Sequence, residues 1–163
     1  MKEQKGNVML ISVLLICAIL IIFVFIMSIF ISQVNSTLYR IKTEIYAMNR
    51  SGIIAVNKII ASEGNFSYSE KEYKKYFIDA LIENFNLNEE LISNEGLIER
   101  VEIKEYKILK KKQKDSFTKK KVEDVTLHTV VEVEINPIIL SKLLDKVFVF
   151  DVHEDVILNG VKM

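Results

Sequence analysis

Cysteine, proline, tryptophan and glycine are scarce in this chain of 163 residues, which has one Cys, one Pro, no Trp and five Gly. A single cysteine excludes an internal disulfide framework and a cysteine-based zinc site. The five glycines stand apart at positions 6, 52, 64, 96 and 160, so the sequence has no glycine-rich phosphate loop. It also lacks the Gly-x-Ser-x-Gly pattern of serine hydrolases and the His-Glu-x-x-His pattern of zinc proteases. Several common signatures of enzymes are therefore missing.

Histidine is also scarce, and its two positions give a weak metal pattern. His128 falls on the polar side of a predicted strand, and His153 stands within the sequence Val152-His153-Glu154-Asp155. A His-Glu-Asp cluster could bind a metal, but a second His or Cys at ligand spacing is missing from it. We therefore expect a solvated strand end, with no metal, no cofactor and no catalytic residue. The protein is expected not to be an enzyme.

Charge of one sign does not dominate, because 22 Lys and Arg balance 22 Asp and Glu. A neutral chain has no overall attraction for nucleic acid, so no nucleic-acid partner is expected. No small-molecule substrate is evident either. The charges are unevenly distributed, however, since residues 8–31 contain none of them.

The run from Val8 to Ile31 is apolar apart from Ser12 and Ser28. It is long enough for a membrane-spanning helix, which needs about 20 apolar residues. A cleaved signal peptide is the alternative, but its apolar region is typically about 7–15 residues long and ends at a small-residue cleavage site. We predict a retained single span at residues 8–31, which makes the lipid bilayer the first expected partner.

The basic residues beside this span indicate its orientation. Lys2 and Lys5 precede it closely, whereas Arg40 and Lys42 follow it at a greater distance. Positive charge close to a span favours the cytoplasmic side. The composition, rich in Ile, Lys and Asn, is typical of an AT-rich bacterial genome. We expect a single-pass protein of the bacterial cell membrane, with its N-terminus cytoplasmic and its C-terminal domain outside.

The helical pattern continues beyond the apolar run, although the composition becomes polar. No proline interrupts residues 7–62, and Gly52 costs a helix only about 1 kcal/mol, so we predict one helix that ends near Ser62. Apolar or small residues recur along it at steps of four and three. They form one stripe, which consists of Val34, Leu38, Ile41, Ile45, Met48, Gly52, Ala55 and Ile59. The stripe could pack on the chain's own C-terminal domain or on other subunits, and both are compatible if they use different arcs.

The residues that follow the long helix predict an α+β domain. The domain boundaries are 1–62 for the membrane and spine helix and 63–163 for an extracytoplasmic head. Ser69 and Glu72 form a capping box, which opens a second helix that ends near Phe85.

Three segments of the head alternate in the manner of β-strands: 98–109, 125–135 and 147–158. In the first, the apolar positions slip from odd to even numbers near Lys104-Glu105, which predicts a β-bulge. A short helical segment is expected at 138–144, after Asn136-Pro137. The fold class is therefore α+β, with a small antiparallel sheet of about three or four strands covered by helices.

A lysine-rich loop separates the first two predicted strands. Its basic residues are Lys110, Lys111, Lys112, Lys114, Lys119, Lys120 and Lys121. One interpretation is a solvated connection between two strands. The other is an electrostatic contact with an anionic partner, such as lipid headgroups, a cell-wall polymer or an acidic protein surface. The second would make the protein a membrane-anchored binding or sensing module.

The order of these elements resembles the TadE-like family of minor pilins and pseudopilins. Lys5-Gly6 stands directly before the apolar helix, and the helix continues through residues 39–55. The segment 131–140 resembles that family's strand followed by a proline and an apolar turn, and the segment 147–152 resembles its closing strand. The resemblance covers about the first 60 and the last 40 residues, so the lysine-rich loop lies outside it.

The resemblance implies a structural role, as a subunit or assembly factor of a surface pilus or a related secretion apparatus. Its implied partners are other pilin-like subunits or assembly-platform proteins. Prepilin-type processing would cut between Gly6 and Asn7. Processed prepilins usually carry Glu five residues after the cleaved Gly, and this sequence has Ile11 there.

Overall fold

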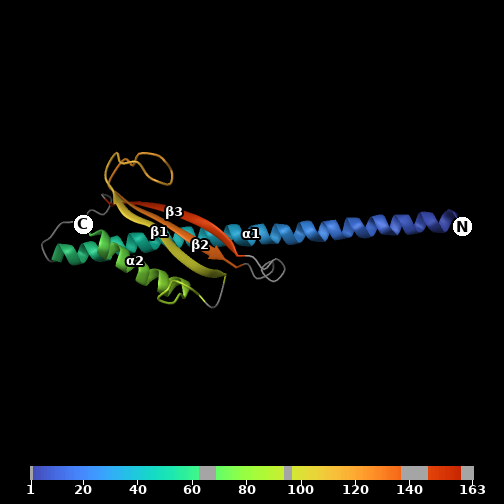
Figure 1. Cartoon of the computed structure of the whole chain (residues 1–163), viewed down its shortest axis with the longest axis horizontal. Helices are drawn as coiled ribbons and strands as arrows, with labels where there is room; N and C mark the ends of the chain where they lie inside the picture. The colour runs from blue at the N-terminus through green and yellow to red at the C-terminus, as the bar shows by residue number, and fades with distance from the viewer. Residues whose placement is uncertain (1, 63–68, 94–96, 137–146, 159–163) are drawn as a thin grey trace. The chain divides into compact units, whose positions relative to one another are not determined.

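In the computed structural model of this chain, residues 2–62, 69–93, 97–136 and 147–158 are described, and the side chains of the first range are described from Met9 to Asn57. The elements in chain order are α1 (Lys2–Ser62), α2 (Glu70–Phe85), β1 (Ile98–Leu109), β2 (Thr126–Ile135) and β3 (Phe148–Ile157) (Figure 1). The chain divides into two compact units, Met1–Ser36 and Thr37–Met163. This division falls within α1, whereas the boundary drawn from the sequence follows the end of that helix.

The predicted fold class is confirmed as α+β. A single helix runs from Lys2 to Ser62, in agreement with the predicted end of the long helix. The described part of the chain also holds a second helix and one antiparallel sheet with strand order β1-β2-β3. Three strands are described, and a fourth is not shown. The helical segment expected at 138–144 lies outside the described residues.

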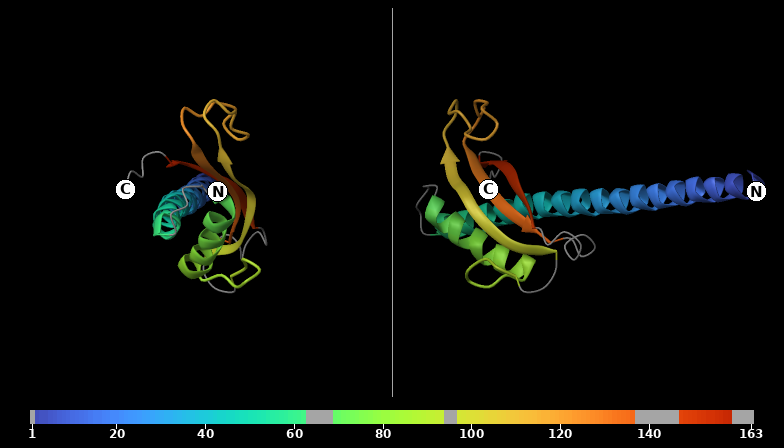
Figure 2. Two further views of the ribbon diagram at one scale, coloured as in Figure 1. Left: turned by 90° about the vertical axis from the view of Figure 1, so that its left-hand side faces the viewer. Right: turned by 45° about the vertical axis from the view of Figure 1, so that its right-hand side comes forward.

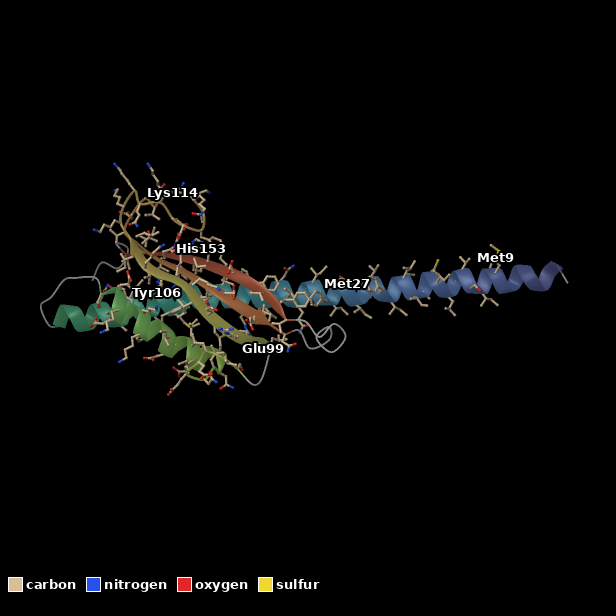
Figure 3. All side chains as sticks on the ribbon, viewed as in Figure 1. Met9, Met27, Glu99, Tyr106, Lys114 and His153 are labelled. Carbon is tan, nitrogen blue, oxygen red and sulfur yellow. The ribbon has the colours of Figure 1, made fainter. Side chains whose placement is uncertain are left out.

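In the first unit, the apolar side chains of α1 between Met9 and Ile31 are exposed around the helix, apart from the half-buried Met27 and Phe30. Their exposed fraction is 73% at Met9, 58% at Leu20 and 52% at Ile31. Figure 3 shows these side chains pointing outward along the helix between the labelled Met9 and Met27. The helix is long and apolar enough to cross a membrane, a criterion that a signal sequence near the N-terminus also meets. Exposed apolar surface of this extent needs an apolar environment.

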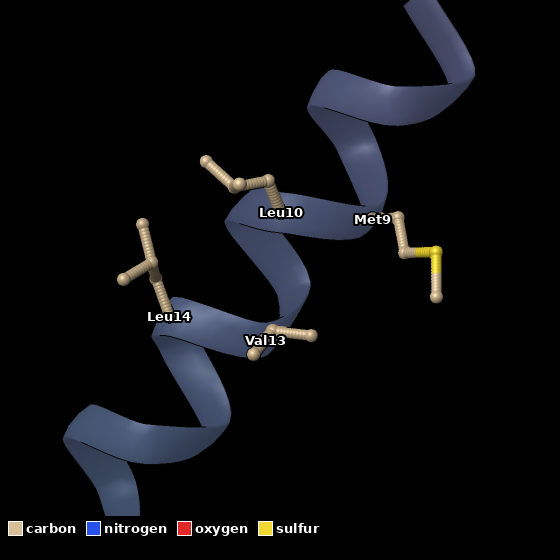
Figure 4. Close-up of a pocket in the computed structure, with 4 residues that line it drawn as sticks. All are labelled: Met9, Leu10, Val13 and Leu14. Carbon is tan, nitrogen blue, oxygen red and sulfur yellow. The ribbon is translucent and has the colours of Figure 1, made fainter.

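The surface of this apolar segment is ridged. Leu10 and Leu14 lie along one side of the helix and Met9 and Val13 along another, four residues apart in each case (Figure 4). A shallow hollow lies between the two rows. Rows of this kind are the surface into which the ridges of a neighbouring helix or the chains of a lipid can pack.

In the second unit, the end of α1 and the whole of α2 cover one face of the sheet (Figures 1 and 2). Ile41 and Ile45 of α1 are fully buried in the same apolar cluster as Phe77 of α2 and Val131 of β2. The helix therefore contributes one face to the core of the domain. Burying a Leu or Ile side chain stabilises a fold by about 1.5–3 kcal/mol, so this face of α1 contributes substantially to the stability of the domain.

The predicted stripe of α1 thus packs largely within the chain's own domain. Ile41, Ile45 and Met48 belong to the core, and Leu38 is packed against it. Gly52 is buried and Ala55 half-buried, while Val34 belongs to the first unit and is 8% exposed. The side chain of Ile59 lies outside the described residues.

Helix α2 begins and ends as its sequence predicts. The Oγ of Ser69 accepts a hydrogen bond from the backbone N–H of Glu72, and Asn86 closes the helix in the left-handed conformation with φ 52°. Tyr76 of α2 lies so close to Gly52 of α1 that a Cβ added at Gly52 would be 2.9 Å from the Tyr76 Cδ1 atom. The glycine in the stripe therefore permits the close approach of α1 and α2.

The predicted bulge in β1 is confirmed. The register of β1 against β2 shifts between Ile103, which pairs with Val131, and Glu105, which pairs with Val130. This extra residue keeps the apolar side chains on one face, since Val101 before the bulge and Tyr106 after it are both buried in the core. A second irregularity lies between Ile98 and Arg100.

Two polar contacts join α1 to the sheet inside the second unit. The amide Nδ2 of Asn49 donates a buried hydrogen bond of 2.9 Å to the Thr129 Oγ1 of β2. Lys42 Nζ lies 3.4 Å from Glu154 Oε1 of β3. Because buried polar groups are costly without partners, the Asn49–Thr129 bond favours one rotation and one position of the helix on the sheet.

A candidate histidine and aspartate centre

Three titratable side chains meet on the face of the sheet that the helices do not cover. His128 of β2 pairs directly with Asp155 of β3 in the antiparallel register. His153 precedes Asp155 by two residues, so it points to the same face of β3. Figure 3 shows His153 on this strand, near the loop that carries the labelled Lys114.

A fourth side chain, Asp115, comes from the loop between β1 and β2. Its carboxylate accepts hydrogen bonds from the backbone N–H groups of Phe117, at 2.7 Å, and Thr118, at 3.1 Å, and from the Thr118 hydroxyl. An aspartate that bonds the N–H groups two and three residues ahead fixes a tight turn. A backbone bridge between Lys114 and Lys121 closes the loop behind this turn. The turn brings Asp115 onto the sheet, where only 1% of its surface is exposed.

The expected solvated strand end is wrong, because the loop folds back over the sheet. His128 is fully buried, and His153 is 16% exposed on its side chain. The ring of Phe117 stacks on the imidazole of His153, with centroids 4.8 Å apart and an angle of 13° between the planes. The polar face of β2 is therefore covered at this end by loop residues.

The four side chains lie close enough to share a single ligand. One ligand atom from each of Asp115, His128, His153 and Asp155 lies within 4.8 Å of all the others. Asp155 Oδ1 is 2.8 Å from His128 Nδ1 and 3.2 Å from His153 Nε2. Asp115 Oδ1 is 3.5 Å from His128 Nδ1, and Asp115 Oδ2 is 3.6 Å from His153 Nε2.

A further set of groups surrounds the other nitrogen of His128. The Nε2 atom lies 3.3 Å from Ser116 Oγ and 3.5 Å from Glu105 Oε2. Ser116 donates its hydroxyl hydrogen to Glu105 at 2.5 Å, and the Lys107 ammonium also contacts that carboxylate. The hydrogen bonds from Lys107 and then Ser116 hold the pKa of Glu105 below its ordinary value. Glu105 is thus a carboxylate in its charged form at neutral pH.

The electrostatics of Asp115 also favour a charged carboxylate. Burial raises the pKa of Asp115, but the hydrogen bonds from Thr118 and from the N–H of Phe117 lower it, as does the nearby His128. The net pKa lies below the ordinary value of an aspartate. The centre therefore combines a buried anion with two imidazoles that can act as neutral ligands or as cations.

One chemical interpretation of this cluster is a nucleophile with its base. Ser116 Oγ, His128 and Asp155 form a line in the order of a Ser-His-Asp triad. The proton of Ser116 is directed at Glu105 rather than at His128, and His128 has no exposed surface. In this arrangement His128 does not accept the serine proton, as the base of such a triad does.

The second interpretation is a cation site. Two imidazole nitrogens and two carboxylates are a common ligand set for transition metals, especially zinc. A shallow hollow beside β3, lined by Leu38, Lys42, Phe117, Phe150 and His153 among others, reaches the edge of the cluster. A solute can therefore approach the centre from the side on which His153 lies.

The other residues that the sequence singled out lie elsewhere. All seven lysines of the loop are exposed, so the loop presents its charge outward while Asp115 and Phe117 contact the sheet. Gly6 and Asn7 fall within α1, and their side chains are outside the description. Processing at that point stays a prediction.

Reasoning from the sequence found His153 and Asp155 but missed their convergence with His128 and Asp115. The alternation His153-Glu154-Asp155 was a usable signal, because residues two apart on a strand share a face. The register that places His128 opposite Asp155, and the fold of the loop, depend on tertiary contacts.

In comparisons with known proteins, no family model, no curated protein and no solved structure matches the chain.

Proposed function

We propose that this protein is a single-pass membrane subunit with a structural role in the assembly of a surface pilus or a related secretion apparatus. The observation that carries the proposal is that α1 has two different environments along its length. Its first part exposes apolar side chains from Met9 to Ile31, and the same helix supplies Ile41 and Ile45 to the core of an α+β domain. An anchor that is continuous with the core of its domain suits a structural subunit.

The proposed location follows from the same helix. The N-terminus would be cytoplasmic and the α+β domain would lie outside the bacterial cell membrane, as the nearby Lys2 and Lys5 favour. Protease added to intact protoplasts should then digest residues beyond Ser62 and leave the span in the membrane. Complete protection of the domain until the membrane is opened would contradict this orientation.

The surface of α1 that remains for partners is the arc opposite the core. Tyr39, Tyr46, Arg50 and Ile54 are exposed and lie within about 80° of one another on a helix with 3.6 residues per turn. Tyr39 is 75% exposed and Tyr46 40% exposed. Because tyrosine and arginine are enriched at protein interfaces, we define these four residues as the assembly arc.

Cysteine crosslinking tests the assembly role at this arc. Cys17 is exposed and is the only cysteine, so it is first replaced by serine. Tyr39→Cys and Tyr46→Cys are then treated in intact cells with a short bismaleimide linker, and adducts are identified by mass spectrometry. Adducts with further copies, pilin-like subunits or platform proteins are expected.

The control for this experiment is Asp79→Cys, an exposed position on the side of α2 opposite to the buried Phe77 and Leu81. It should label with a simple maleimide but give few of the same adducts. Recovery of uncrosslinked monomer from both arc variants, with normal maleimide labelling, would contradict the assembly role.

A second candidate function is a membrane-anchored binding or sensing module. The observation that favours it is the outward presentation of seven lysines on a loop whose base is closed by backbone hydrogen bonds, including Lys112 N–H to Val122 O at 2.8 Å. Replacing all seven with glutamine should weaken cosedimentation with anionic lipid vesicles or cell-wall polymer. Unchanged cosedimentation, with normal membrane insertion, would rule this candidate out.

A further inference from the structure

We propose that Asp115, His128, His153 and Asp155 bind one divalent transition-metal ion, with zinc the best fit. The proposal rests on the side chains of the centre and is independent of the assembly role. It concerns a site of which the sequence shows only the weak pattern around His153 and Asp155.

The distances between the histidine nitrogens and the aspartate oxygens are close to those of a tetrahedral site. Zinc binds imidazole nitrogen and carboxylate oxygen at about 2.0–2.2 Å, so two ligands of a tetrahedral ion lie about 3.3–3.6 Å apart. The four measured separations between the histidine nitrogens and the aspartate oxygens are 2.8, 3.2, 3.5 and 3.6 Å. The four ligand atoms all lie within 4.8 Å of one another, so the side chains must move together for one ion to contact all four.

The state of His153 supports a ligand at this point. Its Nε2 atom is buried and makes no hydrogen bond within the described part of the chain, although two carboxylates lie within 3.6 Å of it. A buried nitrogen without a hydrogen bond is costly, at about 1–3 kcal/mol. Direct coordination of a cation satisfies this nitrogen and also neutralises Asp115 and Asp155.

The surroundings of His128 match the outer shell of a metal site. A histidine that ligates through one nitrogen usually has its other nitrogen oriented by a carboxylate, a carbonyl or a water. Here Nδ1 faces the two aspartates, and Nε2 faces Ser116 and Glu105. Asp115 is in turn held by the N–H groups of its own turn. His128 and Asp115 are therefore held in position by their own neighbours without a metal.

The ligand set also identifies the class of metal. Calcium and magnesium favour sites built entirely from oxygen, whereas imidazole selects zinc and its neighbours in the first transition series. Four protein ligands fill a tetrahedral shell and leave no open position, which is the pattern of a structural rather than a catalytic zinc site. The ion would fasten the loop between β1 and β2, through Asp115, to strands β2 and β3.

The test uses the full chain, purified in detergent with an affinity tag that contains no histidine. After treatment with a chelator, Co²⁺ is added as a spectroscopic probe and Zn²⁺ in competition with a chromophoric chelator. We expect one Co²⁺ per chain with the intense visible bands of tetrahedral coordination, and its displacement by one Zn²⁺.

The variants are His153→Gln and Asp155→Asn, which keep side-chain size and remove one ligand each. The matched control is Asp151→Asn, an exposed carboxylate on the same face of β3, two residues before His153. The two ligand variants should bind Zn²⁺ at least about tenfold more weakly, whereas the control binds like the natural chain. Circular dichroism of each metal-free variant confirms that it is folded.

Two results would overturn the proposal. One is the absence of stoichiometric Co²⁺ and Zn²⁺ binding by the folded natural chain, which would leave a cluster held by hydrogen bonds alone. The other is equal affinity in His153→Gln, Asp155→Asn and Asp151→Asn, which would place the bound ion elsewhere. Neither result bears on crosslinking at the assembly arc, so the two proposals can fail separately.

Discussion

The two parts of α1 have the same backbone structure but opposite surroundings. From Met9 to Ile26 the large apolar side chains are exposed, whereas Ile41, Ile45 and Ile53 of the second unit are completely buried. The first part is apolar on all sides and the second only on one. Helix formation is therefore common to both, and the distribution of apolar side chains around the helix decides whether lipid or protein surrounds it. The two parts should consequently respond differently to the same substitution.

Truncation of a large side chain should give the greatest contrast. Ile45→Ala leaves a cavity in the core and should lower the free energy of unfolding of the domain by about 2–5 kcal/mol. Leu20→Ala, in the exposed apolar segment, should change it by less than about 0.5 kcal/mol. Urea denaturation in detergent, followed by tyrosine fluorescence, measures both. Equal effects of the two substitutions would remove the distinction between the two parts of the helix.

A charged substitution should have its larger effect in the exposed apolar segment, the opposite of truncation. Leu20→Arg places a guanidinium near the middle of the apolar run, which costs about 2.5–3.5 kcal/mol of membrane insertion. Tyr39→Arg, on the exposed arc of the second unit, should leave both insertion and folding close to those of the natural chain. Extraction of membranes with alkaline carbonate separates inserted from released protein. Full retention of Leu20→Arg would argue against a membrane span.

Alkaline pH should affect the second unit through its tyrosines, since all six tyrosines of the chain lie at or beyond residue 39. Burial, and then the proximity of Tyr73 and Glu70, raises the pKa of Tyr106 above its ordinary value. Above about pH 10 the unfolded chain releases this proton and the folded chain retains it, so stability falls as pH rises, by up to about 1.4 kcal/mol per pH unit. Below that pH the two states are equally protonated and Tyr106 adds no pH dependence.

Tyr106→Phe isolates this contribution. The phenylalanine keeps the ring, which lies 5.1 Å from that of Phe77, and removes the titrating group. The free energy of unfolding of the natural chain minus that of Tyr106→Phe should be constant up to about pH 10 and should decrease above it. Denaturant midpoints at pH 8 to 11 test this, and a difference that stays constant throughout would contradict the raised pKa.

The smallest predicted effect concerns the contact of Gly52 with Tyr76. Gly52→Ala gains about 1 kcal/mol from helix propensity, but its Cβ would lie 2.9 Å from Tyr76 Cδ1, so the ring must move. We expect the substitution to be neutral or slightly destabilising alone and stabilising by about 1 kcal/mol in a Tyr76→Ala background. A double-mutant cycle measures this coupling. Additivity of the two substitutions would mean that the contact is not tight.

Much of the fold could be predicted from the sequence because its signals are local. The end of α1 near Ser62, the cap at Ser69 and the bulge between Ile103 and Glu105 each depend on a few neighbouring residues. The sequence did not determine what covers the stripe, since an apolar helix face needs a partner but does not identify it. The packing of Ile41 and Ile45 within the chain's own core resolves that choice for these residues.

The centre could not be predicted because it depends on pairing between distant segments. His128 and Asp155 are brought together by the register of β2 and β3, and Asp115 by a turn that it stabilises itself. A lysine-rich loop is expected to be solvated, and its lysines are exposed. The few residues that contact the sheet, Asp115, Ser116 and Phe117, are hidden among them in the sequence.

The buried bond between Asn49 and Thr129 has a mechanical consequence. Apolar contacts are not directional, so they fix the position of a helix along a sheet less sharply than a hydrogen bond does. The Asn49 amide and the Thr129 hydroxyl form a directional bond across the helix and the sheet, and Lys42 and Glu154 lie close by. A displacement of this part of α1 along its own axis would stretch both contacts, so they oppose sliding of the helix over β2 and β3.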